Sequence, residues 1–231
     1  MLRNLLVLIL SLALGRTVYS QIRIALDPGH GGSDLGAVRD SFVEKKLTLE
    51  ITKKLKEELS RRNLQEVFLT RDSDVSVSLK ERSDLANKFA ADVFISLHAN
   101  TSNSSQISGM EFYFNSSAFK ETDSDRSAVT NVEVLEQIKN DFKHYDKTRK
   151  SLMLSKNIKA KTEAAVEKSV IKRAPFYVIE NTEMPSILIE LGFLSNRRDA
   201  KKLSSEEYQR TIASLIADAL IEWRKTESSK L

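Results

Sequence analysis

Short apolar, β-rich runs alternate with helical stretches along this chain, and this alternation constrains the fold more than any other feature of the sequence. The run DVFISLH (92–98) is nearly all apolar, as expected for a strand buried on both faces of a sheet. The segment 42–62 carries Leu47, Ile51 and Leu55 at a four-residue spacing, which indicates an amphipathic helix. Strands that alternate with helices predict a three-layer α/β/α domain with a twisted, largely parallel sheet.

We expect about six strands in this sheet, because five further β-rich runs lie between turn signals. They are IRIALD (22–27), EVFLT (66–70), GMEFYF (109–114), FYVIE (176–180) and SILIEL (186–191). Further helices are expected over residues 79–90, 151–170 and 205–225, with Ser78 as the N-cap of the first of them.

Three residues that can carry chemistry fall at the ends of expected strands. His30 follows the first strand in the segment DPGHGG, His98 ends DVFISLH, and Glu190 lies near the end of the last strand. Because ligands of α/β sheets bind at the carboxyl ends of the strands, we expect these side chains along one edge of the sheet. The glycines around His30 are expected to let the backbone turn tightly and to leave space beside the imidazole. The alternative interpretations are a turn residue for His30 and a core histidine for His98.

Two histidines and a carboxylate are the usual protein ligands of a catalytic zinc ion, whose fourth position stays open. His30 and His98 are 68 residues apart, so such ligands must come from separate elements. The same ligand types also suit other divalent metals. The spacing leaves the third ligand open among four acids near expected strand or helix ends: Asp27, Asp34, Glu44 and Glu190.

Glu190 is an acid within an apolar strand, in the segment PSILIELGF. An unpaired carboxylate there would be costly, so we expect it to meet a partner or to have a raised pKa. Both properties suit a general base. The alternative is a structural ion pair with a buried arginine.

Five spaced segments give the chain a family resemblance. They are IALDPGHGGSDLGAV, EKKLTLEITKKL, VFLTRDSDVSVSLKERSDLAN, DVFISLHAN and FYVIENTEMPSILIELGFLSN, and they span nearly the whole chain after residue 20. In this order they resemble the zinc-dependent N-acetylmuramoyl-L-alanine amidases of the Amidase_3 type, which include the cell-separation and sporulation amidases of bacteria.

The resemblance implies that His30, Glu44 and His98 are the zinc ligands and that Glu190 is the catalytic acid/base. It implies hydrolysis of the amide between N-acetylmuramic acid and L-alanine in peptidoglycan, on a sheet of about six strands between helices. Two alternatives stay open. One is a catalytically inactive, amidase-like protein that binds wall fragments or a division partner, and the other is a different zinc hydrolase, such as a peptidase or deacetylase.

Other residues in the matching segments have structural interpretations. Arg71, Asp74 and Arg82 are expected to pair with one another or to hold a loop and a helix start, although Arg82 or Asn100 could instead bind substrate. Asn196 is expected to start a helix.

Residues 115–150 are polar, charged and long for a connection, and we interpret them as an insertion on the surface. Part of it has a weak helical periodicity. In the cell-division members of the family, a helical segment at this place covers the active site and puts an acid on the zinc until an activator displaces it. The resemblance therefore suggests autoinhibition through Glu133 or Glu136 and a protein activator that docks here. The alternative is a solvated excursion, and His144 within it is expected to be solvated.

Residues 1–20 have the composition of a secretory signal peptide, with a basic residue, the apolar run LLVLILSLAL and a small-x-small site before Gln21. The run is shorter than the about 20 apolar residues that cross a bilayer. The alternative is a buried first helix or strand. We therefore expect an exported protein, periplasmic or associated with the cell wall, without a membrane span in its mature form. Its catalytic domain would cover 21–226 and a disordered tail 227–231.

Charge and cysteine content narrow the kinds of partner and chemical site that the protein can have. The net charge is +4, and removal of residues 1–20 takes away Arg3 and Arg16 and leaves +2, which gives no indication of a nucleic-acid partner. The absence of cysteine excludes disulfides, thiolate metal sites and a cysteine nucleophile. The expected partner is peptidoglycan, and the expected state is a monomer.

Overall fold

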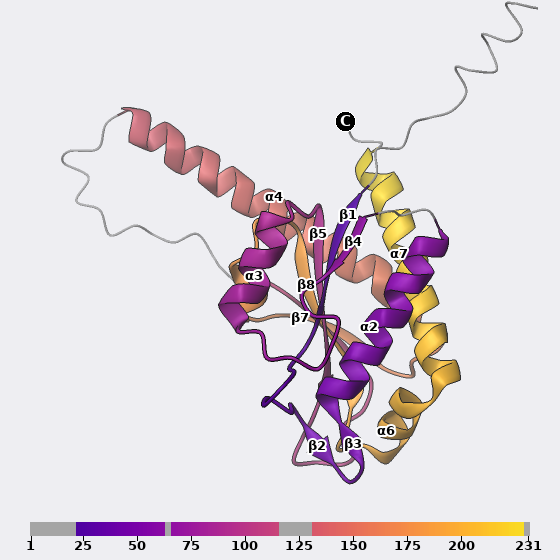
Figure 1. Ribbon diagram of the computed structural model, residues 1–231. Helices are drawn as coiled ribbons and strands as arrows, with labels where there is room; N and C mark the ends of the chain where they lie inside the picture. The colour runs from indigo at the N-terminus through magenta and orange to yellow at the C-terminus, as the bar shows by residue number, and fades with distance from the viewer. Residues whose placement is uncertain (1–21, 63–65, 116–130, 229–231) are drawn as a thin grey trace, which may run out of the picture.

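The computed structural model of the protein describes residues 22–62, 66–115 and 131–228 (Figure 1). Its centre is a six-stranded sheet with the order β4-β1-β5-β8-β6-β7. The strands are β1 (Arg23–Pro28), β4 (Glu66–Leu69), β5 (Val93–Asn100), β6 (Met110–Phe114), β7 (Ser169–Arg173) and β8 (Ser186–Phe193). The first four strands in the sheet order run parallel, β6 is antiparallel to β8, and β7 is parallel to β6.

Helices cover both faces of this sheet. The face with the larger hydrophobic core carries α2 (Glu44–Arg61), α4 (Asn131–Thr162) and α7 (Glu206–Ser228), and the other face carries α3 (Leu79–Lys88) and α5 (Tyr177–Glu180). Figure 1 shows α2 beside α7 on one side of the sheet and α3 on the opposite side. Two smaller elements complete the fold: a hairpin of β2 (Val38–Arg39) and β3 (Phe42–Val43), and α6 (Arg197–Ser204) after β8. The expected three-layer fold with a largely parallel sheet is confirmed.

Burial along β5 explains why its sequence is almost continuously apolar. Val93, Ile95 and Leu97 belong to the main core under α2, α4 and α7, whereas Phe94 points into the smaller core under α3 and α5. Successive side chains of a strand alternate between faces, so a strand covered on both sides needs apolar residues at every position.

Two expected helix starts are confirmed. Ser78 caps α3 in a capping box, in which its hydroxyl accepts from the Glu81 N–H and the Glu81 carboxylate accepts from the Ser78 N–H. Asn196 caps α6, because its side-chain oxygen accepts from the N–H groups of Arg198 and Asp199.

One expected strand and one expected helix end are wrong. FYVIE (176–180) contains the short helix α5, in which the adjacent residues Val178 and Ile179 are both buried in the smaller core. A strand would turn one of these two side chains to the opposite face, so the helical turn buries more apolar surface. The sixth strand is β7, of which only the first two residues fall within the helix expected over 151–170. Its mostly exposed edge position required few apolar residues, so its sequence did not indicate a strand.

Helix α4 runs without interruption from Asn131 to Thr162, so it extends across residue 150, where the insertion was expected to end. Its first part is exposed, whereas Lys147 is buried and donates to the carbonyls of Ile179 and Thr182. From Lys147 onwards, α4 therefore belongs to the body of the domain. The first part of the helix runs away from the sheet in Figure 1.

Most of the expectations for the two ends of the chain concern residues that the structure does not describe. Helix α7 continues to Ser228, so the first two residues of the expected tail, 227–231, are helical. The expected signal peptide, the last three residues and part of the insertion, 116–130, lie outside the described residues. Within the parts of the chain that the structure describes, no helix combines the length and apolar character that a membrane span requires.

Candidate metal centre

His30 is held in an uncommon backbone conformation at the end of β1. Its φ angle is +59°, in the left-handed region that few non-glycine residues adopt. The next turn is closed by paired backbone hydrogen bonds between Gly31 and Asp34, of 2.9 and 3.1 Å. A conformation of this kind persists only where the surroundings enforce it, and two arginines do so here.

Arg71 and Arg82 are buried and donate to the backbone carbonyls around His30. Arg71 donates to the carbonyls of Pro28 and Gly29, at 2.9 and 2.7 Å. Arg82 donates to the carbonyls of Pro28 and His30, each at 2.7 Å, and to the Asp27 carboxylate, also at 2.7 Å. The planar guanidinium groups thus satisfy carbonyls that a tight loop cannot pair within itself. Arg82 is 3% exposed and fully engaged, which favours the structural role over a substrate contact.

Two other polar residues of the matching segments, Asp74 and Asn100, have structural partners as well. Asp74 accepts from the Gly32 N–H at 2.8 Å and from Lys45 Nζ at 2.7 Å, so it holds the second half of the same loop. Asn100 donates to the Glu111 carboxylate at 3.1 Å.

The structure distinguishes the four acids that the spacing left open as the third ligand, because each has different surroundings. Asp27 is buried and bonded to Arg82 and Ser96, away from the histidine nitrogens. Asp34 accepts from Nδ1 of His30 at 2.8 Å, so it orients that ring from behind. A carboxylate in this position fixes the tautomer of a histidine whose other nitrogen binds a metal.

Glu44 is the acid that joins the two histidines. Its Oε1 lies 3.0 Å from His30 Nε2 and 2.9 Å from His98 Nδ1, and the ligand atoms of the three residues all lie within 4.8 Å of one another. Backbone N–H groups fix the carboxylate, since Ala99 donates to Oε1 at 3.0 Å and Ala37 donates to Oε2 at 2.7 Å. Glu44 is the first residue of α2, directly after the β2–β3 hairpin, so this hairpin sets its position.

Two glycines allow these side chains to come together. A Cβ atom on Gly29 would lie 2.4 Å from Cε1 of His98, and one on Gly36 would lie 2.5 Å from Oε2 of Glu44. The space that the sequence predicted beside the histidine is therefore filled at Gly29 by the ring of His98. The glycine permits close packing of the cluster.

Glu190 lies beside this cluster on β8, directly opposite His98 of β5. Its Oε2 is buried and has no hydrogen-bond partner among the residues described, and Glu190 forms no ion pair within them. Burial raises the pKa of Glu190 to about 7, and the negative charges of Glu44 and Glu111 add to this effect against the opposing influence of His98. The alternative of a structural ion pair with a buried arginine finds no support.

The electrostatics of the cluster favour a cation. Burial raises the pKa of Glu44, but hydrogen bonds from His30 and His98 outweigh it and hold that pKa well below its usual range, so the group is a carboxylate. Burial lowers the pKa of His30, but the hydrogen bonds to Glu44 and Asp34 outweigh it and raise that pKa overall.

The donor set fits zinc. Two imidazole nitrogens and one carboxylate oxygen converge, one ring is oriented by a second carboxylate, and both histidines line a cleft of about 450 Å³. These features define the class of the protein: an α/β domain with a candidate hydrolytic metal centre at the carboxyl edge of its sheet.

Comparison with known proteins gives the family. The family model described as N-acetylmuramoyl-L-alanine amidase matches residues 24–222. The chain is 34% identical to the probable amidase AmiB of Haemophilus influenzae over 91% of its own length and 54% of the relative's. It is 32% identical to the amidase LytC of Bacillus subtilis over 87% of its own length and 35% of the relative's. This chain therefore spans about half the length of AmiB and about a third of that of LytC.

Solved structures agree with this family. The catalytic domain of the amidase CwlV from Paenibacillus polymyxa is 30% identical, with a TM-score of 0.69 over 87% of this chain and 97% of that one. The amidase CwlD of Clostridioides difficile, solved in complex with the GerS lipoprotein, is 28% identical, with a TM-score of 0.70 over 89% and 99%. The chain belongs to the N-acetylmuramoyl-L-alanine amidase family, whose members are hydrolases of peptidoglycan.

Proposed function

We propose that this chain is a zinc-dependent N-acetylmuramoyl-L-alanine amidase that cleaves the amide between the lactyl group of N-acetylmuramic acid and L-alanine of the stem peptide. The observation that carries the proposal is the position of Glu190. Its carboxyl group, whose buried Oε2 has no hydrogen-bond partner among the described residues, lies one strand away from His98, which belongs to the convergent ligand set with His30 and Glu44.

His30, Glu44 and His98 would hold the zinc ion, with Asp34 as the carboxylate that orients His30. When bound, zinc supplies a Lewis acid that polarises the scissile carbonyl and lowers the pKa of water. Glu190 would take a proton from the attacking water at its carboxylate and return it to the departing nitrogen of L-alanine. Its raised pKa, about 7, suits a group that both accepts and donates a proton near neutral pH.

Purified muropeptides test this function. The wild-type protein should release the stem peptide from the lactyl group, a chelator should stop the release, and added zinc should restore it. Glu190→Ala should bind zinc with unchanged stoichiometry and lose hydrolysis. A protein that binds muropeptides without cutting them would support the inactive alternative, and release of acetate or cleavage within the stem would support the deacetylase or peptidase alternative.

Residues 1–20 would serve as the signal peptide that exports the enzyme to the periplasm or cell wall, because peptidoglycan lies outside the cytoplasmic membrane. We place the catalytic domain at 21–226 and expect a monomer. Mass spectrometry of the protein recovered from the cell envelope should find Gln21 as the N-terminus, and light scattering should give the mass of one chain. An uncut chain in the envelope would contradict the proposed cleavage.

The first part of α4 would be the docking surface for a protein activator. Several of its large apolar side chains are exposed, at 65% for Leu135, 46% for Ile138, 70% for Phe142 and 59% for Tyr145. Their spacing of three and four residues puts them on one side of the helix. The related amidase CwlD was solved with a lipoprotein partner, and an exposed apolar stripe suits a partner with an apolar groove.

The same helix would also carry the autoinhibitory acids, Glu133 or Glu136. Both are exposed and stand outside the His30–Glu44–His98 cluster in this structure, so inhibition requires the first part of α4 to move. Because Lys147 and Thr148 bond to the body of the domain, point substitutions test this better than a deletion to residue 148. Glu133→Ala with Glu136→Ala should raise basal hydrolysis, with Asp141→Ala as the control. An unchanged rate would contradict autoinhibition by these acids.

A further inference from the structure

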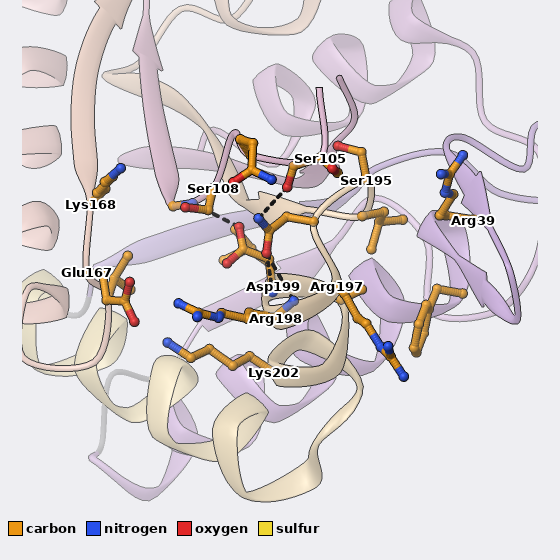
Figure 2. Close-up of a pocket in the computed structure, with 18 of the residues that line it drawn as sticks. Arg39, Ser105, Ser108, Glu167, Lys168, Ser195, Arg197, Arg198, Asp199 and Lys202 are labelled. Carbon is orange, nitrogen blue, oxygen red and sulfur yellow. Dashed lines mark hydrogen bonds between the residues drawn. The ribbon is translucent and has the colours of Figure 1, made fainter. Parts of the chain in front are cut away.

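A second cavity lies at the same edge of the sheet, on the other face. Its volume is about 620 Å³, and it forms where the β2–β3 hairpin, the loop before β6, residues 166–168 and the start of α6 meet (Figure 2). Leu191 lines it and belongs to the main core, whereas the preceding residue, Glu190, lies with His98 on the opposite face of the sheet. The cavity is therefore separate from the cleft beside His30.

The lining of this cavity is rich in basic side chains. It contains five of them, Arg39, Lys168, Arg197, Arg198 and Lys202, against the three acids Asp40, Glu167 and Asp199. Asp199 is already engaged, because its Oδ2 accepts from the N–H groups of Gly109 and Phe193 at 2.8 and 3.0 Å. Figure 2 shows Arg197, Arg198 and Lys202 below Asp199, with Lys168 and Arg39 toward opposite sides of the view.

These cations lack acidic partners of their own. Within the ranges 22–62, 66–115 and 131–228, neither Arg39, Lys168, Arg197 nor Arg198 forms an ion pair, although many other surface cations of the domain do. Lys202 lies 5.9 Å from the centre of the Tyr208 ring. Several unpaired cations around one concave surface concentrate a positive potential there, which favours an anionic ligand.

The floor of the cavity is apolar, in contrast to its basic side chains. Leu191 and Leu194 are buried, and the half-buried rings of Phe42 and Tyr208 also contribute to the lining. An apolar floor with charged groups at the entrance suits a ligand that combines an aliphatic part with a carboxylate, because arginine donates two parallel hydrogen bonds to such a group. A stem peptide of peptidoglycan, with alanine side chains and free carboxylates, has this chemistry.

We propose that this cavity binds a carboxylate-bearing stem peptide of the peptidoglycan polymer, other than the one being cut. The proposal rests on the proposed amidase function for its substrate class. Phe42 lies two residues before Glu44, and Leu191 follows Glu190, so both sites lie at one edge of the sheet. Because peptidoglycan repeats its stem peptides, occupation of the cavity would keep the polymer close to the metal centre and raise its effective concentration there.

Two substrates of different size test the proposal. The variant Arg197→Glu with Arg198→Glu reverses two cations of the cavity, and Lys53→Glu with Lys56→Glu makes the same change of charge on the exposed side of α2. On a soluble muropeptide with one stem, both variants should match the wild-type kcat/KM. On intact sacculi, the cavity variant should be slower by about 10-fold, whereas the control variant should keep the wild-type rate.

A binding assay separates this inference from the proposed function. At 4 °C, the wild type and the control variant should sediment with sacculi, and the cavity variant should stay largely in solution. Sacculi whose carboxylates have been amidated should lose the wild-type protein, and sacculi stripped of phosphate-bearing polymers should retain it. Equal sedimentation of the cavity variant, or loss on stripping of phosphate alone, would overturn the proposal. If no amide is hydrolysed but these binding differences appear, only the proposed function fails.

Discussion

Glu190 of β8 is paired in register with His98 of β5, so a carboxyl group whose buried Oε2 has no hydrogen-bond partner in the described parts of the chain lies one strand away from an imidazole that contacts Glu44. Burying an unpaired carboxylate is unfavourable, and folding alone would not select for it. Such a group lowers the folding stability in return for a catalytic function, and the loss of stability can be measured.

The first prediction concerns the pH dependence of stability. The pKa of Glu190 rises from 4.5 to about 7 on folding, so the folded state binds its proton more tightly. The resulting stabilisation is complete below pH 4.5 and is lost as the pH rises to about 7. For the metal-free protein, Glu190→Gln should therefore gain about 2–3 kcal/mol relative to the wild type between pH 4 and pH 8. Urea unfolding at the two pH values measures this gain.

The exposed acid Glu183 provides the control for that measurement. Glu183→Gln makes the same chemical change outside the site, so the gain at Glu190 is read relative to it at each pH. A gain for Glu190→Gln that does not depend on pH would show that the carboxyl group of Glu190 titrates normally in the folded protein.

The second prediction concerns Asp34. Because its carboxylate accepts from Nδ1 of His30, it fixes the ring with Nε2 directed at Glu44. Asp34→Ala should weaken zinc binding by about 10- to 100-fold, and Asp34→Asn, which keeps an acceptor oxygen, should lose less. Competition with a chromophoric chelator gives both affinities, and equal affinities for all three proteins would contradict the orienting role.

The third prediction concerns Gly29. A Cβ atom there would lie 2.4–2.7 Å from three atoms of the His98 ring, so Gly29→Ala should displace that ring from Glu44. We expect zinc affinity to fall by at least about 10-fold, since one of the three proposed ligands moves. Circular dichroism should show that the variant is folded, and the chelator competition measures the loss. Unchanged affinity in a folded variant would mean that the loop relaxes around the added methyl group.

The fourth prediction separates the two roles considered for Arg82. Arg82→Ala removes the partner of the buried carboxylate of Asp27 and three donors to loop carbonyls, so it should destabilise the protein by about 3 kcal/mol or more. Arg82→Lys keeps the charge and should lose less. A substrate contact would instead raise KM without a change in the urea midpoint, and that result would restore the binding interpretation.

The sequence predicted the interior of the sheet well because strands covered on both faces need continuous apolar runs, as DVFISLH has. It failed for two other segments. FYVIE has the composition of a strand but buries adjacent residues in a helical turn on one face of the sheet, and β7 is an exposed edge strand with little apolar character. Local composition cannot separate these cases, since the packing partners of both segments lie far away in the chain.

The candidate site was partly predictable for a related reason. The positions of His30, His98 and Glu190 followed from the rule that ligands collect at the carboxyl ends of parallel strands. Glu44 was assigned as the third ligand only through the resemblance. Its position depends on a hairpin of two two-residue strands, β2 and β3, which the spacing of residues in the sequence does not reveal. The basic cavity could not be predicted at all, since separate segments of the chain meet there only after folding.

The carbonyls around His30 are fixed by Arg71 and Arg82 through contacts that involve none of the proposed metal-ligand side chains. The chain therefore loses the conformational entropy of this loop when the domain folds, and little remains to be lost when an ion arrives. This protein should thus differ from small zinc domains that are unfolded without metal. Its apoprotein should stay folded and able to rebind the ion, so that the metal supply where the enzyme acts can control its activity without controlling its abundance.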